Sequence, residues 1–248
     1  MIQIIILRKN HNMKYIGSKN KLKKYYAPIF TKYLNDNYFV DIFCGGCNLI
    51  DGIIHPKRIA NDINYYLVEM LIAITNGWKP PQEITREKYY HIKENKQSYS
   101  PALVGFVAFL CSFGGKEWGG YAFNNSGRNY ALEACKNLER QVPKLQNIIF
   151  KNMDYRNLDI PTNSLIYADP PYANTTKYSN KFDHEQFWNW CREKSKTNIL
   201  FISEYNAPQD FKCIFEKEIT STLNKNKKDP KIEKLFIHES LEKTINII

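Results

Sequence analysis

The chain has 248 residues, of which 43% are hydrophobic and 24% are charged, and its formal net charge is +10. This length and composition predict a globular protein with a sizeable core, and they exclude disordered, collagen-like and small disulfide-stabilised chains. The positive charge suits a polyanionic partner such as nucleic acid, although a basic surface also favours solubility.

The chain opens with a short apolar stretch, residues 1–7, followed by Arg8 and Lys9. The stretch is too short to span a membrane, and its charges stand on the wrong side for a signal peptide. We therefore expect a cytoplasmic protein with no membrane partner. Residues 1–12 are interpreted either as an additional edge strand or as an extension upstream of a start at Met13.

Short apolar runs then alternate with helical patterns. We expect strands at residues 38–43, 58–61, 147–150, 164–168 and 198–203, and helices at residues 20–33, 63–76 and 183–196. This alternation predicts an α/β fold whose sheet is covered by helices on both faces. The end of the chain predicts an antiparallel hairpin at the sheet edge, with strands at residues 215–223 and 232–238.

The regular alternation stops between Pro80 and Pro143, where a mostly helical segment begins and ends. We therefore predict a sheet domain formed by residues 1–80 and 144–248, with an inserted helical subdomain at residues 81–143.

Aromatic residues and glycines are mixed in the middle of this insert. Phe106 and Phe109 are expected in its core, with Phe113 as a further candidate. Glycines allow close approach to a ligand, and Lys116 and Arg128 are the better candidates for contacts with guanine or phosphate.

The six cysteines show no pattern of metal ligands. Cys44 and Cys47 form a single C-x-x-C, with neither a second pair nor two nearby histidines, whereas structural zinc sites need four such ligands. We therefore expect no metal, and we interpret the cysteines as free thiols in a reducing compartment.

Cys44-Gly45-Gly46-Cys47 follows the first expected strand as a tight turn into a helix. Glycines there let a ligand approach the backbone, and Asp62, about twenty residues later, stands where an acid can accept ribose hydroxyls. The dinucleotide spacing G-x-G-x-x-G is absent. A plain strand–turn–helix remains the alternative, with Asp62 as a helix N-cap.

The most informative segment is Asp169-Pro170-Pro171-Tyr172, directly after the expected strand at residues 164–168. Ligands bind at this end of strands in open α/β sheets. The prolines lack N–H donors, so the Asp169 carboxylate and the Pro170 carbonyl form a pair of acceptors beside the Tyr172 ring. Such a pair can hold both hydrogens of an aromatic amine and direct its lone pair at an electrophile. A proline turn with an incidental acid is the alternative.

Asp-Pro-Pro-Tyr resembles the catalytic motif of amino-group DNA methyltransferases that form N6-methyladenine. Further segments resemble motifs of this family in the same order: Met13-Lys14-Tyr15-Ile16-Gly17-Ser18-Lys19, Phe43-Cys44-Gly45-Gly46-Cys47, Ala60-Asn61-Asp62, Asn152-Met153-Asp154 and residues 200–205. Cys47 stands where the family usually has a glycine. The order is similar to that of Dam-type enzymes (alpha group, D12 class), which implies a Rossmann-like S-adenosylmethionine-dependent methyltransferase sheet with an inserted target-recognition subdomain.

The resemblance also implies residue roles. The implied catalytic residues are Asp169, Pro170 and Tyr172. The implied contacts to S-adenosylmethionine are Tyr15, Lys19, Asp41, Phe43, Gly45, Asp62 and Asp154. The candidates for DNA contacts are Lys14, Lys116, Arg128, Tyr178, Lys225, Lys227 and Lys228. The alternatives are solvated lysines and a turn at Asp154.

The predicted function is site-specific methylation of adenine N6 in double-stranded DNA, with a GATC-like site as the default. The target base must be flipped out, because a stacked base cannot enter a pocket. Rival substrates are RNA adenine, cytosine N4 and a glutamine amide, of which Asp169 disfavours the last and Tyr172 the second. An inactive DNA-binding module is a further alternative. We expect a monomer in a bacterial or phage-infected cell, either solitary or in a restriction–modification system.

Overall fold

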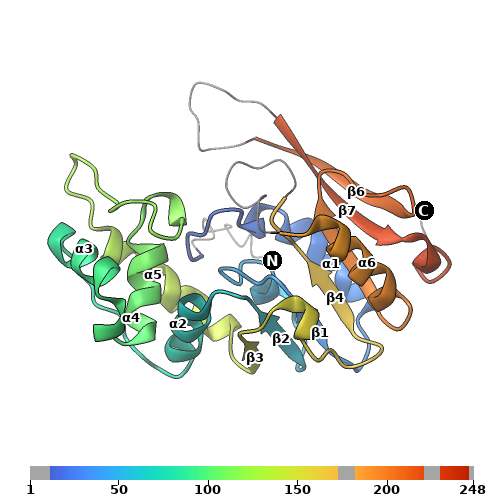
Figure 1. The fold of residues 1–248 in the computed structure, drawn as a ribbon, viewed down its shortest axis with the longest axis horizontal. Helices are drawn as coiled ribbons and strands as arrows, with labels where there is room; N and C mark the ends of the chain where they lie inside the picture. Colours follow the sequence, from blue (N-terminus) through green and yellow to red (C-terminus); the bar gives the residue numbers. More distant parts are fainter. Residues whose placement is uncertain (1–11, 173–181, 221–229, 246–248) are drawn as a thin grey trace, which may run out of the picture. The chain divides into compact units, whose positions relative to one another are not determined.

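The computed structural model describes residues 12–172, 182–220 and 230–245 (Figure 1). The chain divides into two compact units. The first unit contains Met1–Lys23, Gly45–Gly52 and Tyr65–Gln146. The second unit contains Lys24–Cys44, Ile53–Asn64 and Asn147–Ile248.

The second unit is built on a sheet that has seven strands in the described part of the chain, in the order β3-β2-β1-β4-β5-β7-β6. The strands are β1 (Phe39–Asp41), β2 (Arg58–Asn61), β3 (Ile148–Lys151), β4 (Leu165–Ala168), β5 (Ile199–Glu204), β6 (Phe211–Thr220) and β7 (Pro230–His238). Neighbours among β1 to β5 pair in parallel, whereas β7 runs antiparallel to β5 and β6. The expected Rossmann-like α/β fold is confirmed, and the terminal hairpin inserts its last strand between β5 and the edge strand β6.

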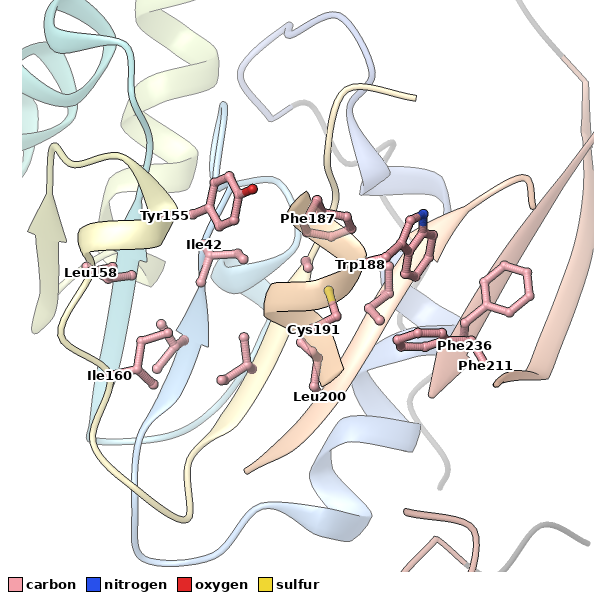
Figure 2. Packing of buried hydrophobic residues seen from close by; sticks show 14 of the residues in the cluster. Ile42, Tyr155, Leu158, Ile160, Phe187, Trp188, Cys191, Leu200, Phe211 and Phe236 are labelled. Carbon is pink, nitrogen blue, oxygen red and sulfur yellow. The ribbon is translucent and has the colours of Figure 1, made fainter. Parts of the chain in front are cut away.

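Helices of the second unit cover both faces of this sheet. Successive strand residues point to opposite faces, so Val40 and its neighbours in β4 and β5 pack with α6 (His184–Ser195) in one buried cluster. Figure 2 shows Phe187, Trp188 and Cys191 on the side of α6 that faces the strands. On the opposite face, Phe30 of α1 (Lys23–Tyr33) contacts the rings of Phe39, Tyr167 and Phe201.

The first unit is helical in its described part. Its helices are α2 (Tyr65–Thr75), α3 (Arg86–Glu94), α4 (Pro101–Gly105, continued by a π-helical turn at Phe106–Leu110) and α5 (Tyr130–Gln141). Each of α3, α4 and α5 begins after a residue whose side chain accepts a backbone N–H: Thr85, Ser100 and Asn129. Such caps satisfy donors that the first helical turn leaves open, which is why the helices begin where they do.

The core of this unit is only partly as expected. Phe106 and Phe109 are buried, which confirms the expectation for both. Phe113 is 68% exposed, so its assignment to the core is wrong. The chain turns directly after Phe113: Gly114 and Gly115 both have a φ of 68°, a left-handed conformation that glycine adopts readily.

No helix in the described ranges is long and apolar enough to cross a membrane. All six cysteines are free thiols, as expected, and Cys213 is exposed.

We predict that Phe187→Ala destabilises the protein by about 3–5 kcal/mol, because the ring is fully buried and its removal leaves a cavity. The measurement is urea unfolding followed by fluorescence and circular dichroism. Glu193→Ala, an exposed change on the same helix, is the control and should stay within about 0.5 kcal/mol of wild type. Equal effects of the two changes would contradict the assigned packing of α6.

Candidate active site

Four carboxylates follow the ends of four neighbouring strands in the second unit. Asp41 ends β1, Asp62 follows β2, Asp154 comes shortly after β3, and Asp169 directly follows β4. Because these strands are parallel, their carboxyl ends meet at the same edge of the sheet, which is the edge that binds ligands in open α/β folds. Asp41 and Asp62 are nearly buried, at 2% and 9% exposure.

Asn61 holds two of the connecting loops at this edge. Its amide Nδ2 donates to the carbonyls of Ile42, 3.1 Å away, and Met153, 3.0 Å away, and its Oδ1 accepts from the Met153 N–H. The side chain is 1% exposed. Asn61 lies within a segment that resembles a family motif, and its position beside an acid at a strand end is the signal in the sequence that could have indicated this role.

Asp62 is not a helix N-cap, because α2 begins three residues later, at Tyr65. Its Oδ1 instead accepts the Asn64 N–H at 2.9 Å. Asp154 does form a turn: its Oδ1 accepts the Arg156 N–H at 3.0 Å and the Arg156 Nε–H at 2.8 Å. The hydrogen-bonded Arg156 guanidinium lowers the pKa of Asp154, so this carboxylate is ionised at neutral pH.

The Asp169-Pro170-Pro171-Tyr172 segment continues from β4, with Asp169 partly exposed and Pro170 buried. Tyr172 is 9% exposed and is held at two points. Its hydroxyl donates to Oε2 of Glu233 on β7 at 2.8 Å, and its ring meets Tyr205 edge to face with centroids 4.5 Å apart. Burial, then the carboxylates of Asp169 and Glu233, raise the pKa of Tyr172, so its hydroxyl remains a donor.

Glu233 is not among the site residues predicted from the sequence. It stands in the last strand, 61 positions from Tyr172, and no pattern within that strand indicates a contact with the Asp-Pro-Pro-Tyr segment.

In the first unit, the N-terminal motif packs on the glycine loop. A Cβ at Gly45 would lie 2.5 Å from Cε1 of Tyr15, and one at Gly46 would lie 2.9 Å from Cβ of Tyr15. Gln141 of α5 joins the two segments, because its Oε1 accepts the Met13 N–H and its Nε2 donates to the Gly46 carbonyl, both at 3.0 Å. The structure thus brings Tyr15 and Gly45 together. Lys19 is 9% exposed, so it is not a solvated lysine.

Cys47, at the position where a glycine was expected, has a φ of 55° and is fully buried. This is the left-handed region, which costs an L-residue about 1–2 kcal/mol relative to glycine. The departure from the family pattern therefore changes the residue but keeps the backbone turn.

The DNA-contact candidates are only partly brought together. Lys14 and Arg128 meet at Glu133, where Lys14 Nζ is 2.8 Å from Oε1 and Arg128 Nε is 2.6 Å from Oε2. Lys116 is half-buried. Tyr178, Lys225, Lys227 and Lys228 lie outside the described residues. Within the described residues, no group of His, Cys, Asp and Glu could hold a metal ion.

Residues 15–216 match the model of a protein family described as D12 class N6 adenine-specific DNA methyltransferase. The chain belongs to this family. The D12 resemblance predicted from the motifs is confirmed, and with it the assignment to a family of enzymes.

Two curated relatives of this D12 member are modification enzymes. Modification methylase StsI of Streptococcus sanguinis is 30% identical over 220 residues, which cover 76% of this chain and 32% of that protein. Type II methyltransferase M.FokI of Planomicrobium okeanokoites is 26% identical over 225 residues, which cover 76% of this chain and 33% of that protein. The D12 chain thus spans about a third of the length of these relatives.

Among solved structures, the rRNA methyltransferase aviRa from Streptomyces viridochromogenes matches the D12 chain with a TM-score of 0.43 at 12% sequence identity. The match covers 92% of this chain and 87% of that one.

We predict that Cys47→Gly is tolerated in this D12 chain, because glycine adopts the same φ without strain. Cys47→Val should destabilise it by more than about 1–2 kcal/mol, because a β-branched residue suits this conformation poorly. Thermal unfolding of the two variants checks whether Cys47→Gly is more stable than Cys47→Val. Equal stability of Val and Gly would show that the turn at position 47 is not left-handed.

We also predict that Tyr172→Phe lowers turnover moderately, by about fivefold, because the ring remains but loses its hydrogen bond to Glu233. Tyr172→Ala should lower it by at least about a hundredfold, because the ring itself is lost. Steady-state methyl transfer provides the measurement. If Phe is as damaging as Ala, the hydroxyl matters more than the ring.

Proposed function

We propose that this protein transfers a methyl group from S-adenosylmethionine to N6 of a flipped-out adenine in double-stranded DNA. The observation that carries the proposal is the Asp169-Pro170-Pro171-Tyr172 segment at the carboxyl end of β4, in a chain of the D12 family. The segment offers two acceptors and an aromatic face at the ligand-binding edge of the sheet, which is the chemistry that an adenine amino group requires.

In this mechanism the Asp169 carboxylate and the Pro170 carbonyl accept the two N6 hydrogens. Their positions favour a pyramidal nitrogen, whose lone pair is otherwise delocalised into the ring. As the new N–C bond forms and the bond between the methyl group and sulfur breaks, positive charge develops on N6, and the nearby carboxylate stabilises it. One proton then passes from N6 to solvent. The Tyr172 ring stacks on the base and offsets part of the cost of flipping, which is a few kcal/mol.

The chain's residues fit the cofactor. S-Adenosylmethionine supplies a methyl group on a positively charged sulfur. Gly45 and Gly46 lack a Cβ, which lets Tyr15 lie directly against the loop, and acids after strand ends suit hydroxyl and amino groups of a nucleoside. We assign cofactor contacts to Tyr15, Lys19 and Gly45 of the first unit. In the second unit we assign them to Asp41, Phe43, Asp62 and Asp154.

DNA is proposed as the substrate because the family methylates DNA adenine and the chain carries a charge of +10. We propose residues 81–143 as the target-recognition segment, with the other ranges, 1–80 and 144–248, binding cofactor and performing the chemistry. A GATC-like site is the first sequence to test. The names of the two relatives support a restriction–modification role. We also propose that the protein acts as a monomer in the cytoplasm.

We predict that Asp169→Ala lowers methyl transfer by about a hundredfold or more, because it removes an acceptor preorganised for the reacting amine. Its affinity for S-adenosylmethionine should remain close to that of wild type. Tritiated-methyl incorporation into DNA gives the rate, and calorimetry gives the affinity.

Asp62→Ala is the matched control, since it removes a carboxylate at the same sheet edge. It should weaken cofactor binding and leave the turnover at saturating cofactor largely intact. Near-normal transfer by Asp169→Ala would overturn the mechanism. Incorporation into RNA or protein, or failure of the wild type to methylate any DNA, would overturn the substrate assignment.

A further inference from the structure

The first unit contains a recess of about 230 Å³ that has no assigned function. All its lining residues belong to this unit. Its polar groups come from Ser112, Asn137, Glu133, Lys14 and Arg128, and its aromatic groups from Phe113 and Tyr130. A cavity of this size can hold a planar heterocycle.

Asn137 is the most unusual residue in the recess. It is 4% exposed, and its side-chain amide has no hydrogen-bond partner among the described residues. Its amide atoms are not among the fully buried side-chain atoms that lack a partner, so they open into the recess that Asn137 lines. An amide that is nearly buried, lines a recess and lacks a partner is suited to receive one from a ligand.

Tyr130 and Glu133 are presented by the same helix as Asn137. Tyr130, Glu133, Ala134 and Asn137 recur at three- and four-residue intervals along α5, so they share one face. Glu133 on this face holds both neighbouring cations, Lys14 through Oε1 and Arg128 through Oε2. The two cations also lie near the Tyr130 ring, with Lys14 Nζ at 5.4 Å and the Arg128 Cζ at 4.9 Å from its centroid.

The geometry of Arg128 leaves part of its guanidinium available. Glu133 engages Nε and Nη2 on one side of the group. The outer edge, which carries Nη1, keeps donors for a second acceptor pair. An arginine held in this way is preorganised for bidentate recognition, because less side-chain freedom remains to be lost on binding.

We propose that this recess binds a purine of the DNA recognition sequence by its N7 edge, with the Asn137 amide as the contact at its floor. Asn pairs with adenine N6 and N7, and Arg or Lys pairs with guanine O6 and N7, so N7 is the acceptor that both kinds of contact share. Glu133 acts as a positioning residue for Lys14 and Arg128. The inference rests on the proposed action on DNA, and it adds a second base-binding site built from residues other than Asp169 and Tyr172.

A phosphate is the rival occupant. It would satisfy Lys14 and Arg128, but it would leave the acceptor of the Asn137 amide unused and would bring no ring to Tyr130 and Phe113. An adenine uses the donor and acceptor of the amide together, through N7 and the N6 amino group, and offers a face to the aromatic side chains. The composition of the recess therefore favours a base.

The test begins with selection of bound duplexes from a random pool, which defines the preferred sequence without requiring methyl transfer. Each purine of that sequence is then replaced in turn by its 7-deaza analogue, and binding is measured by fluorescence anisotropy. The affinity of the wild-type protein for DNA should fall by about tenfold or more when one particular purine is replaced by its 7-deaza analogue. The Asn137→Leu variant should bind the parent duplex as weakly as wild type binds the 7-deaza duplex. Its affinity should not change further when that purine is replaced by the 7-deaza analogue.

Measurements of thermal stability distinguish base binding by Asn137 from a role in stabilising the fold. Asn137→Leu should leave thermal stability unchanged or raise it, because an amide without a partner is replaced by an apolar group of similar size. Asn137→Asp, which keeps the shape but loses the amide donors, should show the same loss at the same purine. The Glu133→Gln variant should show a smaller difference in affinity between the parent duplex and the duplex that carries the 7-deaza analogue at that purine. Lys136→Gln, an exposed change on the same helix, is the control and should keep the full base preference.

The proposal would be overturned if the Asn137→Leu variant still lost affinity when the same purine is replaced by its 7-deaza analogue. So would an Arg128→Ala variant that loses affinity equally for all sequences and shows a shallower salt dependence, because that is the behaviour of a phosphate contact. Wild-type protein that binds DNA without any sequence preference would also overturn it. Methyl incorporation, measured separately, decides the proposed function, so the two can fail independently.

Discussion

The parallel hydrogen bonding of β1, β2, β3 and β4 is the constraint on which the candidate active site depends. It sets the carboxyl ends of these strands at one edge, and the acids that follow them are gathered there although they are far apart in sequence. The register matters equally. Val40 pairs with Ile166, and both point to the α6 face. A slip of one residue would exchange the two faces and turn Tyr167 toward α6.

In the first unit, the N-terminal motif is held against the glycine loop by close contacts and hydrogen bonds, and not by strand pairing. Glycines at positions 45 and 46 allow Tyr15 and Met13 to lie against the loop, and the Gln141 amide joins both segments by hydrogen bonds. Gln141 lies two turns beyond Glu133 on α5. One helix therefore braces the glycine loop at its C-terminal end and presents the recess residues toward its N-terminal end, so the two features share a rigid support.

Two glutamates organise the groups proposed to contact DNA. Glu233 holds the hydroxyl of Tyr172, and Glu133 holds Lys14 and Arg128. Partly exposed ion pairs of the second kind contribute only about 0–1 kcal/mol to stability. Their larger effect is on geometry, because each fixes side chains that would otherwise sample many rotamers. Asn137 differs from these residues: it is nearly buried and lines the recess, which is why we propose it as a base contact.

The sequence by itself determined the α/β class, the hairpin, the positions of the strands, the glycine turn and the Asp-Pro-Pro-Tyr segment, because these follow from local periodicity, turn chemistry and a short motif. Only the tertiary structure decided that Phe113 is exposed, that Asp62 does not cap α2, that Glu233 bonds Tyr172, that Gln141 bonds the glycine loop, and that Asn137 lines the recess. Tyr172 and Glu233 are 61 positions apart, and Met13 and Gln141 are 128 positions apart. Contacts at such separations arise from strand order and helix packing, and periodicity along the chain carries no information about them.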